Sequence, residues 1–200
     1  MTSCVPVSFT ALCGLDRATQ LTDGNAVDDP AATGIAASLK GSCGTTFAVA
    51  TASLADPTVF DAADGRLLIE RREVVLTAGG FFFNPLVGAL ETARRTPLYF
   101  TSDATSDGWA SSATGAPVHT FPSASVTAGH DFFVVELLTD GDGRLVLVDY
   151  GVGAGGTQAA GRQAEAILAS AATHTDTWYL YEWTLAADGG NAVALVASGK

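Results

Sequence analysis

The sequence predicts an α/β protein with a layered, largely parallel sheet, β-hairpins added at its edges and one long insertion. Apolar strand-like runs alternate along the chain with stretches that have helical periodicity. Three segments, which begin near Val5, Val74 and Leu145, repeat one plan of strand, glycine-containing loop, capped helix and strand. The third of them, from Arg144 to Trp183, joins two apolar strands through a glycine-rich turn and a helix, which is typical of a βαβ unit.

Length and composition favour one globular domain over residues 1–200. A chain of this size buries about 70% of the surface that its unfolded form exposes. The net charge of −11 predicts repulsion from phosphate backbones and anionic lipid, so we expect no nucleic-acid partner. No apolar run reaches the length of a membrane span, and the N-terminus lacks the basic and apolar regions of a signal peptide.

The three cysteines do not form a metal-binding pattern. Cys4, Cys13 and Cys43 include no C-x-x-C pair and have no neighbouring histidine, so we expect no zinc site. Two states remain open for them. Either Cys4 and Cys13 form a disulfide with Cys43 buried, or all three are reduced and lie in the core.

The first third of the chain is expected to hold a strand, a helix and a second strand. Asp29 has the character of an N-cap, Pro30 suits the first helical position, and Gly41 suits the position after the helix. In chain order, the expected elements are a strand over Val5–Leu12, a polar loop over Thr19–Asp28, this helix, a strand over Thr45–Ala52 and a turn region over Asp56–Gly65.

The next segment, Arg66–Thr77, has strand character with a charged interruption at Glu70–Glu73, so it is one bent strand or two. We interpret Glu70 and Glu73 as a solvated strand face rather than a general acid/base pair.

A second helix is expected to begin after the glycines that end this strand. Asn84 is its predicted cap and Pro85 its first residue, with Leu86, Val87, Leu90 and Ala93 facing inward. A strand over Pro97–Thr101 follows.

Residues 102–130 form a Ser/Thr/Gly-rich insertion that carries Trp109, His119 and Phe121. Structureless loops of this length are uncommon inside compact domains and usually have a function. One interpretation makes these three residues partner contacts that are buried in a neighbouring molecule. The other is a pair of short strands that packs its aromatic side chains back on the domain.

The last third is predicted to contain two hairpins around a helix. Asp131–Thr139 and Arg144–Val148 flank a turn at Asp140–Gly143. An EF-hand loop would need a carboxylate at Gly151, so we expect no calcium site at this turn. The closing hairpin is predicted from Trp178–Leu185, a turn at Asp188–Asn191 and a strand at Ala192–Ala197.

The glycine-rich turn matches G-x-G-x-x-G at Gly151, Gly153 and Gly156, with a helix expected to open at Thr157. In a nucleotide-binding protein these four residues would hold a pyrophosphate at the helix N-terminus. The ribose-binding acid expected about 20 residues later falls near Asp176, before the next strand rather than at its end. Tight packing of the helix against the sheet explains the same glycines, so our main interpretation assigns no cofactor.

No spacing selects a nucleophile. The serines include no G-x-S-x-G elbow, and His119, His130 and His174 stand in no diagnostic relation to a serine and an acid. Cys43 would need a histidine brought to it by the fold. We therefore assign no catalytic residue and expect a non-enzymatic protein.

Two groups of segments resemble archaeal surface-layer (S-layer) proteins over about half the chain, residues 74–172. The segments are Val74–Gly80 with Asn84–Leu90, and then Asp131–Glu136, the Asp140–Gly143 turn, Leu145–Tyr150 and Gly156–Ala160. The resemblance implies an α/β domain that serves as a repeating unit of a coat.

The resulting functional hypothesis is a structural subunit of an ordered extracellular or virion assembly, such as a surface layer, a filament or a virus shell or tail. Its partners would be copies of itself and other structural proteins. Because a virion protein assembles inside its host, the lack of a recognisable signal peptide favours a virus over a cell coat. One alternative is a small α/β enzyme or nucleotide-binding domain using the Gly151–Gly156 loop. Another is a binding module with Trp109 or Trp178 as a stacking platform.

Overall fold

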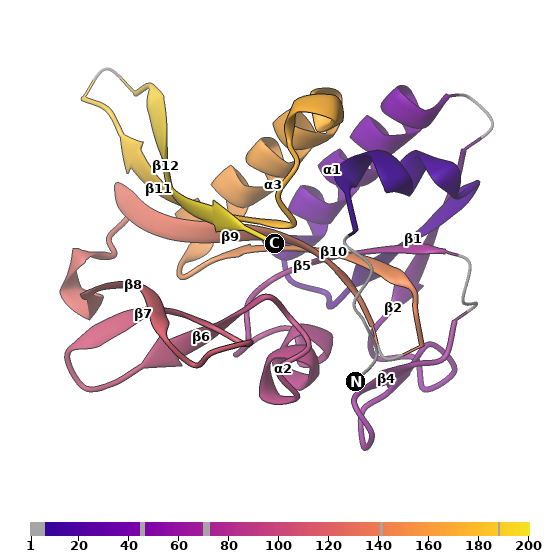
Figure 1. Ribbon diagram of the computed structural model, residues 1–200, viewed down its shortest axis with the longest axis horizontal. Helices are drawn as coiled ribbons and strands as arrows, with labels where there is room; N and C mark the ends of the chain where they lie inside the picture. Colours follow the sequence, from indigo (N-terminus) through magenta and orange to yellow (C-terminus); the bar gives the residue numbers. More distant parts are fainter. Residues whose placement is uncertain (1–6, 45–46, 70–72, 141, 188) are drawn as a thin grey trace.

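The computed structural model describes residues 7–44, 47–69, 73–140, 142–187 and 189–200 (Figure 1). In this part of the chain a mixed sheet of seven strands has the order β12-β11-β9-β10-β5-β1-β2. Its strands are β1 (Arg17–Thr22), β2 (Ala48–Ser53), β5 (Val74–Ala78), β9 (His130–Thr139), β10 (Leu145–Gly151), β11 (Trp178–Leu185) and β12 (Asn191–Gly199). The α/β class is therefore confirmed.

The sheet is only half parallel, which corrects the prediction of a largely parallel sheet. β2, β1, β5 and β10 run in parallel, whereas β9 is antiparallel to both β10 and β11. The tight turn at Asp140–Arg144 places β9 beside β10 as a hairpin. The following helix carries the chain past β9, so β10 and β11 run in the same direction with β9 between them.

Helices cover one face of the sheet and mixed structure covers the other (Figure 1). α1 (Asp28–Cys43), α3 (Ala154–Ala169) and the 3-10 helix η1 (Phe9–Gly14) lie on the first, which we call the α1–α3 face. The second, the α2 face, carries α2 (Pro85–Thr92) and a meander of three strands within the described residues. The meander strands are β6 (Leu98–Ser102), β7 (Ser106–Ser111) and β8 (Pro117–Pro122).

The short segments of the fold are two further 3-10 helices and a two-stranded ladder in the described part of the chain. They are η2 (Ser123–Ser125), η3 (Ala171–Thr173), β3 (Phe60–Asp61) and β4 (Arg66–Leu67). The region predicted as Arg66–Thr77 thus contains two strands, β4 and β5. No helix in the described segments is long and apolar enough to cross a membrane.

The meander decides between the two interpretations of residues 102–130. The segment forms β7, β8 and η2 rather than an extended loop, and β7 pairs with β6 on one side and β8 on the other. Its aromatic side chains turn toward the main sheet. The second interpretation, strands that pack their aromatics on the domain, is confirmed.

The start of α2 agrees with its predicted cap. The side-chain oxygen of Asn84 accepts hydrogen bonds from the backbone N–H groups of Leu86 at 3.0 Å and Val87 at 3.2 Å. Its amide group donates to the Thr77 hydroxyl and the Ala78 carbonyl, both at 2.7 Å. Asn84 therefore joins the helix to the end of β5 as well as capping it.

α1 and α3 cross at very short range. A Cβ atom built on Gly161 would lie 2.9 Å from the Cβ of Ala31, closer than side chains pack. Small residues on α3, such as Ala160 and Ala164, are fully buried at this contact face. The alanine-rich surface of α3 is therefore the surface that packs on α1 and the sheet.

Three predictions for the N-terminal region are wrong. Residues 9–14 form a 3-10 helix rather than the end of a strand over Val5–Leu12, whose beginning lies outside the described residues. β1 occupies Arg17–Thr22, where a polar loop was expected to begin. α1 starts at Asp28, so Asp29 belongs to its first turn and is not the cap, and the helix continues through Gly41 to Cys43.

The polar residues of β1 mislead because their partners are distant in the sequence. The Gln20 amide donates to the Thr33 hydroxyl at 2.8 Å, and the Thr19 hydroxyl donates to the Glu73 carboxylate. Arg17 also approaches Glu73, at 3.5 Å. Glu73 is buried, which corrects its assignment to a solvated strand face, while Glu70 lies outside the described residues.

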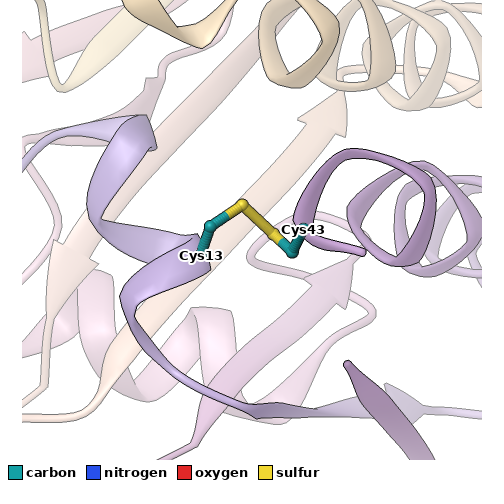
Figure 2. The surroundings of a disulfide bond; sticks show 2 residues. All are labelled: Cys13 and Cys43. Carbon is teal, nitrogen blue, oxygen red and sulfur yellow. A yellow bond between two sulfur atoms is a disulfide. The ribbon is translucent and has the colours of Figure 1, made fainter. Parts of the chain in front are cut away.

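A disulfide joins Cys13 of η1 to Cys43 at the end of α1 (Figure 2). This pairing replaces the predicted alternatives, Cys4–Cys13 or three reduced cysteines. Cys4 itself lies outside the described residues. The bond ties η1 to the carboxyl end of α1, across 30 positions of sequence.

Candidate functional site at the carboxyl edge of the sheet

The carboxyl ends of β1, β5 and β10 form the edge where open α/β sheets place their ligands. β1 and β10 lead into α1 and α3 on one face, whereas β5 leads into α2 on the other. The connections therefore diverge on either side of β5, and a crevice is expected there. Three features occupy this edge: a small aromatic cavity, a closed glycine loop and a cluster of carboxyl groups.

The aromatic cavity has a volume of about 220 Å³ and lies between the segments that follow β5 and β10. It is lined mainly by Phe81, Phe82, Phe83, Phe100 and Tyr150, with Asp107 at its wall. Phe82 and Phe83 are each 70% exposed. The cavity is smaller than the 300–1,000 Å³ typical of ligand pockets, and Ser102 and Asp107 contribute polar groups to its mainly aromatic wall.

The glycine loop is closed by an internal carboxylate. α3 begins at Ala154 with Gly153 as its N-cap, three residues before the predicted start at Thr157. The Asp131 carboxylate, at the start of β9, accepts hydrogen bonds from the N–H groups of Gly153 at 3.0 Å and Gly156 at 2.7 Å. Asp131 thus takes the place at the helix N-terminus that an anionic ligand would use.

The glycines are needed for this closure. A Cβ on Gly156 would lie 2.6 Å from the Asp131 carboxyl carbon, and one on Gly151 would lie 2.3 Å from the backbone of Gly156. The hydroxyl of Thr157 accepts a hydrogen bond from the Gly151 N–H at 3.1 Å. The four residues Gly151, Gly153, Gly156 and Thr157 therefore bind one another and Asp131.

A buried cluster of carboxyl groups lies on the α1–α3 face of the same edge. Asp149 of β10 is fully buried, and neither of its carboxyl oxygens has a hydrogen-bond partner in the described part of the chain. Burial raises the pKa of Asp149 well above its usual value, and the charges of Asp28 and Glu165 raise it further. Burial, followed by the charge of Asp23, raises the pKa of Asp28 to about 7.

The Asp28 carboxyl is therefore largely protonated when the surrounding water is mildly acidic. Among the described residues, no group of three or more His, Cys, Asp or Glu side chains is arranged to hold a metal ion. The turn carboxylates of Asp140 and Asp142 are bound by Arg144, at 2.6 Å and 3.0 Å. The Arg144 guanidinium therefore bridges the two carboxylates of this turn.

A second acidic network fastens the meander to the α2 face. Tyr150 donates a hydrogen bond to the Glu91 carboxylate, and the Trp109 indole N–H donates to the Tyr150 oxygen at 2.9 Å. Glu136 accepts from the Leu98 N–H at 2.8 Å. Burial raises the pKa of both Glu91 and Glu136, opposed for Glu91 mainly by the Tyr150 hydrogen bond.

Sequence reasoning missed these buried acids, although a signal for two of them is present. Glu136 stands within the apolar run Phe132–Leu138, and Asp149 stands within Leu145–Tyr150. A charged residue inside a run that reads as a buried strand is a candidate for a buried ionisable group. Glu91 has no comparable signal, because acidic residues are common on helices.

The structure places Trp109 and Phe121 inside the molecule, with 0% and 4% exposure, so neither supplies exposed contact surface. His119 is partly buried and packs its ring 5.8 Å from that of Phe121 and 5.2 Å from that of Phe132. Together with Trp178, which is partly buried against the α2-face core, these rings stabilise the fold. The role of Trp109 and Phe121 as partner contacts is therefore corrected.

The remaining histidines, His130 and His174, each contact neighbouring polar groups. His130 contacts the Glu182 carboxylate at 2.7 Å through Nε2 and the Ser125 carbonyl at 2.8 Å through Nδ1. The Glu182 hydrogen bond raises the pKa of His130. The Nδ1 atom of His174 lies 3.1 Å from the Ser170 carbonyl oxygen and 3.3 Å from the Ser170 hydroxyl. Cys43 is held in the disulfide.

Comparison with known proteins adds no family. No family model, curated protein or solved structure matches the chain.

Proposed function

We propose that this protein is a structural subunit that works through contacts with copies of itself in an ordered extracellular or virion assembly. The proposal rests on the location of the large apolar side chains that remain exposed. Among the described residues, six of the seven such side chains lie on two segments, the Phe81–Phe83 loop and the β11–β12 hairpin. Grouped exposed apolar residues mark protein–protein contacts more often than isolated ones do.

The interior of the molecule supports the same proposal. Asp131 fills the helix N-terminus that would bind an anion, and residues 102–130 contribute two strands to a packed meander. Both arrangements favour rigidity. A subunit of an ordered lattice or shell gains from a rigid body, because each flexible segment that is ordered on assembly costs conformational entropy.

The disulfide and the charge support a location outside the reducing interior of a cell. Disulfides such as Cys13–Cys43 persist in secreted and virion-surface proteins and are rare in the cytosol. The acidic composition, with a net charge of −11, is compatible with a protein that works in salt or outside a cell. An extracellular, cell-surface or virion location is part of the proposal.

Electron microscopy of native material, with light scattering alongside, tests the proposal directly. Lattices, tubes or particles are the expected result, and a monomer at high concentration across salt and calcium conditions would refute it. The alternative of nucleotide binding requires Asp131 to leave the N–H groups of Gly153 and Gly156. Thermal melts test it, since NAD(P), FAD or ATP at 100 times its Kd would add about 2.7 kcal/mol of stability.

A further inference from the structure

β12 is an edge strand with an unusual surface. It closes one end of the sheet and pairs only with β11 among the described strands. Its nine residues, Asn191–Gly199, include no charged residue and no proline. Natural proteins usually protect a sheet edge with lysine, proline or a bulge, because its free N–H and C=O groups can pair with another chain.

A bulge divides this edge and leaves its first five residues regular. The register passes from Leu180–Ala197 to Tyr181–Leu195, so Val196 has no partner on β11. A bulge locally disrupts the ladder and bends its strand. Continuous pairing with another strand is therefore available along Asn191–Leu195, the stretch of β12 in which every residue is exposed.

An apolar patch lies on one side of this stretch. Cross-strand pairs share a face, so Val193 and Leu195 lie on the α1–α3 face beside their partners Trp183 and Tyr181. The N-terminal turn of α3 covers Trp183 through Gly155. Val193 and Leu195 lie one strand further out and remain 41% and 56% exposed, and Leu185 on β11 is 46% exposed. Figure 1 shows the hairpin extending beyond α3.

The charge pattern indicates what can pair here. With a net charge of −11, two copies of the chain repel each other over most approaches. Within β11 and β12 the acidic residue is Glu182, which lies on the α2 face, opposite the patch, and contacts His130 at 2.7 Å. Asn191–Leu195 itself carries no charged residue, so two copies that pair along this segment bring none of its own side-chain charges together.

We propose that Asn191–Leu195 of β12 pairs antiparallel with the same segment of a second copy, about a two-fold axis at Val193. Val193 then faces its counterpart, Ala192 faces Ala194, and Asn191 faces Leu195. A two-fold axis perpendicular to the sheet keeps the α1–α3 faces of both copies on one side. The exposed side chains of Leu185, Val193 and Leu195 from each copy thereby form one continuous apolar surface across the joint.

This inference rests on the proposed function and specifies one of its contacts. A five-residue strand pair is a small interface, so the dimer is expected to be weak in solution and to be strengthened by other contacts in an assembly. Growth beyond the dimer needs a second interface, because a two-fold contact closes on itself.

Charge substitutions at Val193 provide the test. Sedimentation velocity over a range of concentrations should show that Val193→Lys and Val193→Glu each weaken association at least about tenfold, because like charges oppose each other at the axis. An equal mixture of the two variants should regain association as a heterodimer. Ala50→Lys, which adds the same charge to the other edge strand β2, is the matched control and should associate like the native protein.

The outcomes separate the two proposals. Pairing at β12 is overturned if Val193→Lys associates as well as the native protein does. It is also overturned if the mixture fails to regain the association that each variant lost. Either result leaves self-assembly intact. A native protein that is monomeric at every concentration would overturn the proposed function, and this contact with it. Because Val193 is exposed on an edge, circular dichroism melts should show that the variants fold like the native chain.

Discussion

Replacing Asp28 by Asn should change how the stability of this protein depends on pH. The Asp28 carboxyl is only 6% exposed at the start of α1, and burial with the nearby Asp23 charge raises its pKa from 3.8 to about 7. A rise of about three pKa units, at about 1.4 kcal/mol each, corresponds to about 4 kcal/mol. This is an upper value, because water and salt at the edge of the sheet screen the charges around Asp28.

The sign follows from which state holds the proton. Below about pH 4 both folded and unfolded chains are protonated at Asp28, and its contribution to stability is fully present. Between about pH 4 and pH 7 the unfolded chain loses the proton first, so the free energy of unfolding falls as pH rises. Asp28→Asn carries no such proton. The variant should therefore gain stability relative to the native protein across this window, by up to about 4 kcal/mol.

Urea unfolding followed by tryptophan fluorescence, at several values between about pH 2 and pH 8, measures the difference. Other buried acids titrate in both proteins, so they largely cancel when the two curves are subtracted. Asp103→Asn is the control of opposite sign. Hydrogen bonds, first from the Thr105 N–H and then from Ser106, lower the pKa of Asp103 to about 2. That carboxylate stabilises the fold above its unfolded pKa, and its contribution is lost as pH falls toward about 2.

A difference between native and Asp28→Asn stability that stays constant from about pH 4 to pH 8 would refute the reasoning. It would mean that Asp28 ionises in the folded chain as readily as in the unfolded one. The carboxyl group would then have water or a cation beside it.

Three other substitutions test the interior. Asp131→Ala should cost about 1–3 kcal/mol because the N–H groups of Gly153 and Gly156 lose their acceptor; Asp131→Asn keeps one oxygen and should cost less, and equal losses in urea unfolding would contradict the capping role. Replacing Cys13 and Cys43 together by Ser opens a loop spanning 30 positions, which should lower stability by about 3–4 kcal/mol; native protein treated with reductant should unfold at the same denaturant concentration as this variant. Trp109→Ala should cost about 3–5 kcal/mol because it leaves a cavity against a fully buried ring; a loss below about 1 kcal/mol in denaturant titrations would show that Trp109 is not packed as described.

Local patterns predicted several elements well. Asn84 and Pro85 stand next to the helix that they start. The two strands of the closing hairpin likewise follow each other across a short turn. These signals need only neighbours in the sequence, because a cap acts on the N–H groups two and three positions ahead. The turn at Asp140–Gly143 is local in the same way, and its hairpin agrees with the prediction.

Predictions that depended on distant partners failed more often. β1 has a polar sequence, yet Gln20 and Thr19 are buried because Thr33 and Glu73 satisfy their hydrogen bonds. The cysteine pairing also had to wait for the fold, since η1 and the end of α1 meet only in the tertiary structure. Asp131 lies 25 positions before Gly156, whose N–H group donates a hydrogen bond to the Asp131 carboxylate in the glycine loop.

The sequence by itself determined the α/β class, the cap of α2, the two hairpins and the βαβ connection around α3, because periodicity and turn chemistry act over a few residues. Only the tertiary structure decided that half the sheet is antiparallel, that Asp131 fills the glycine loop, and that Asp28 and Asp149 share a buried cluster. Each of these depends on which segments meet after long stretches of chain are brought together. The free energy of those contacts comes from burial and charge interactions between segments that are distant in the sequence, so a short stretch of sequence does not predict it.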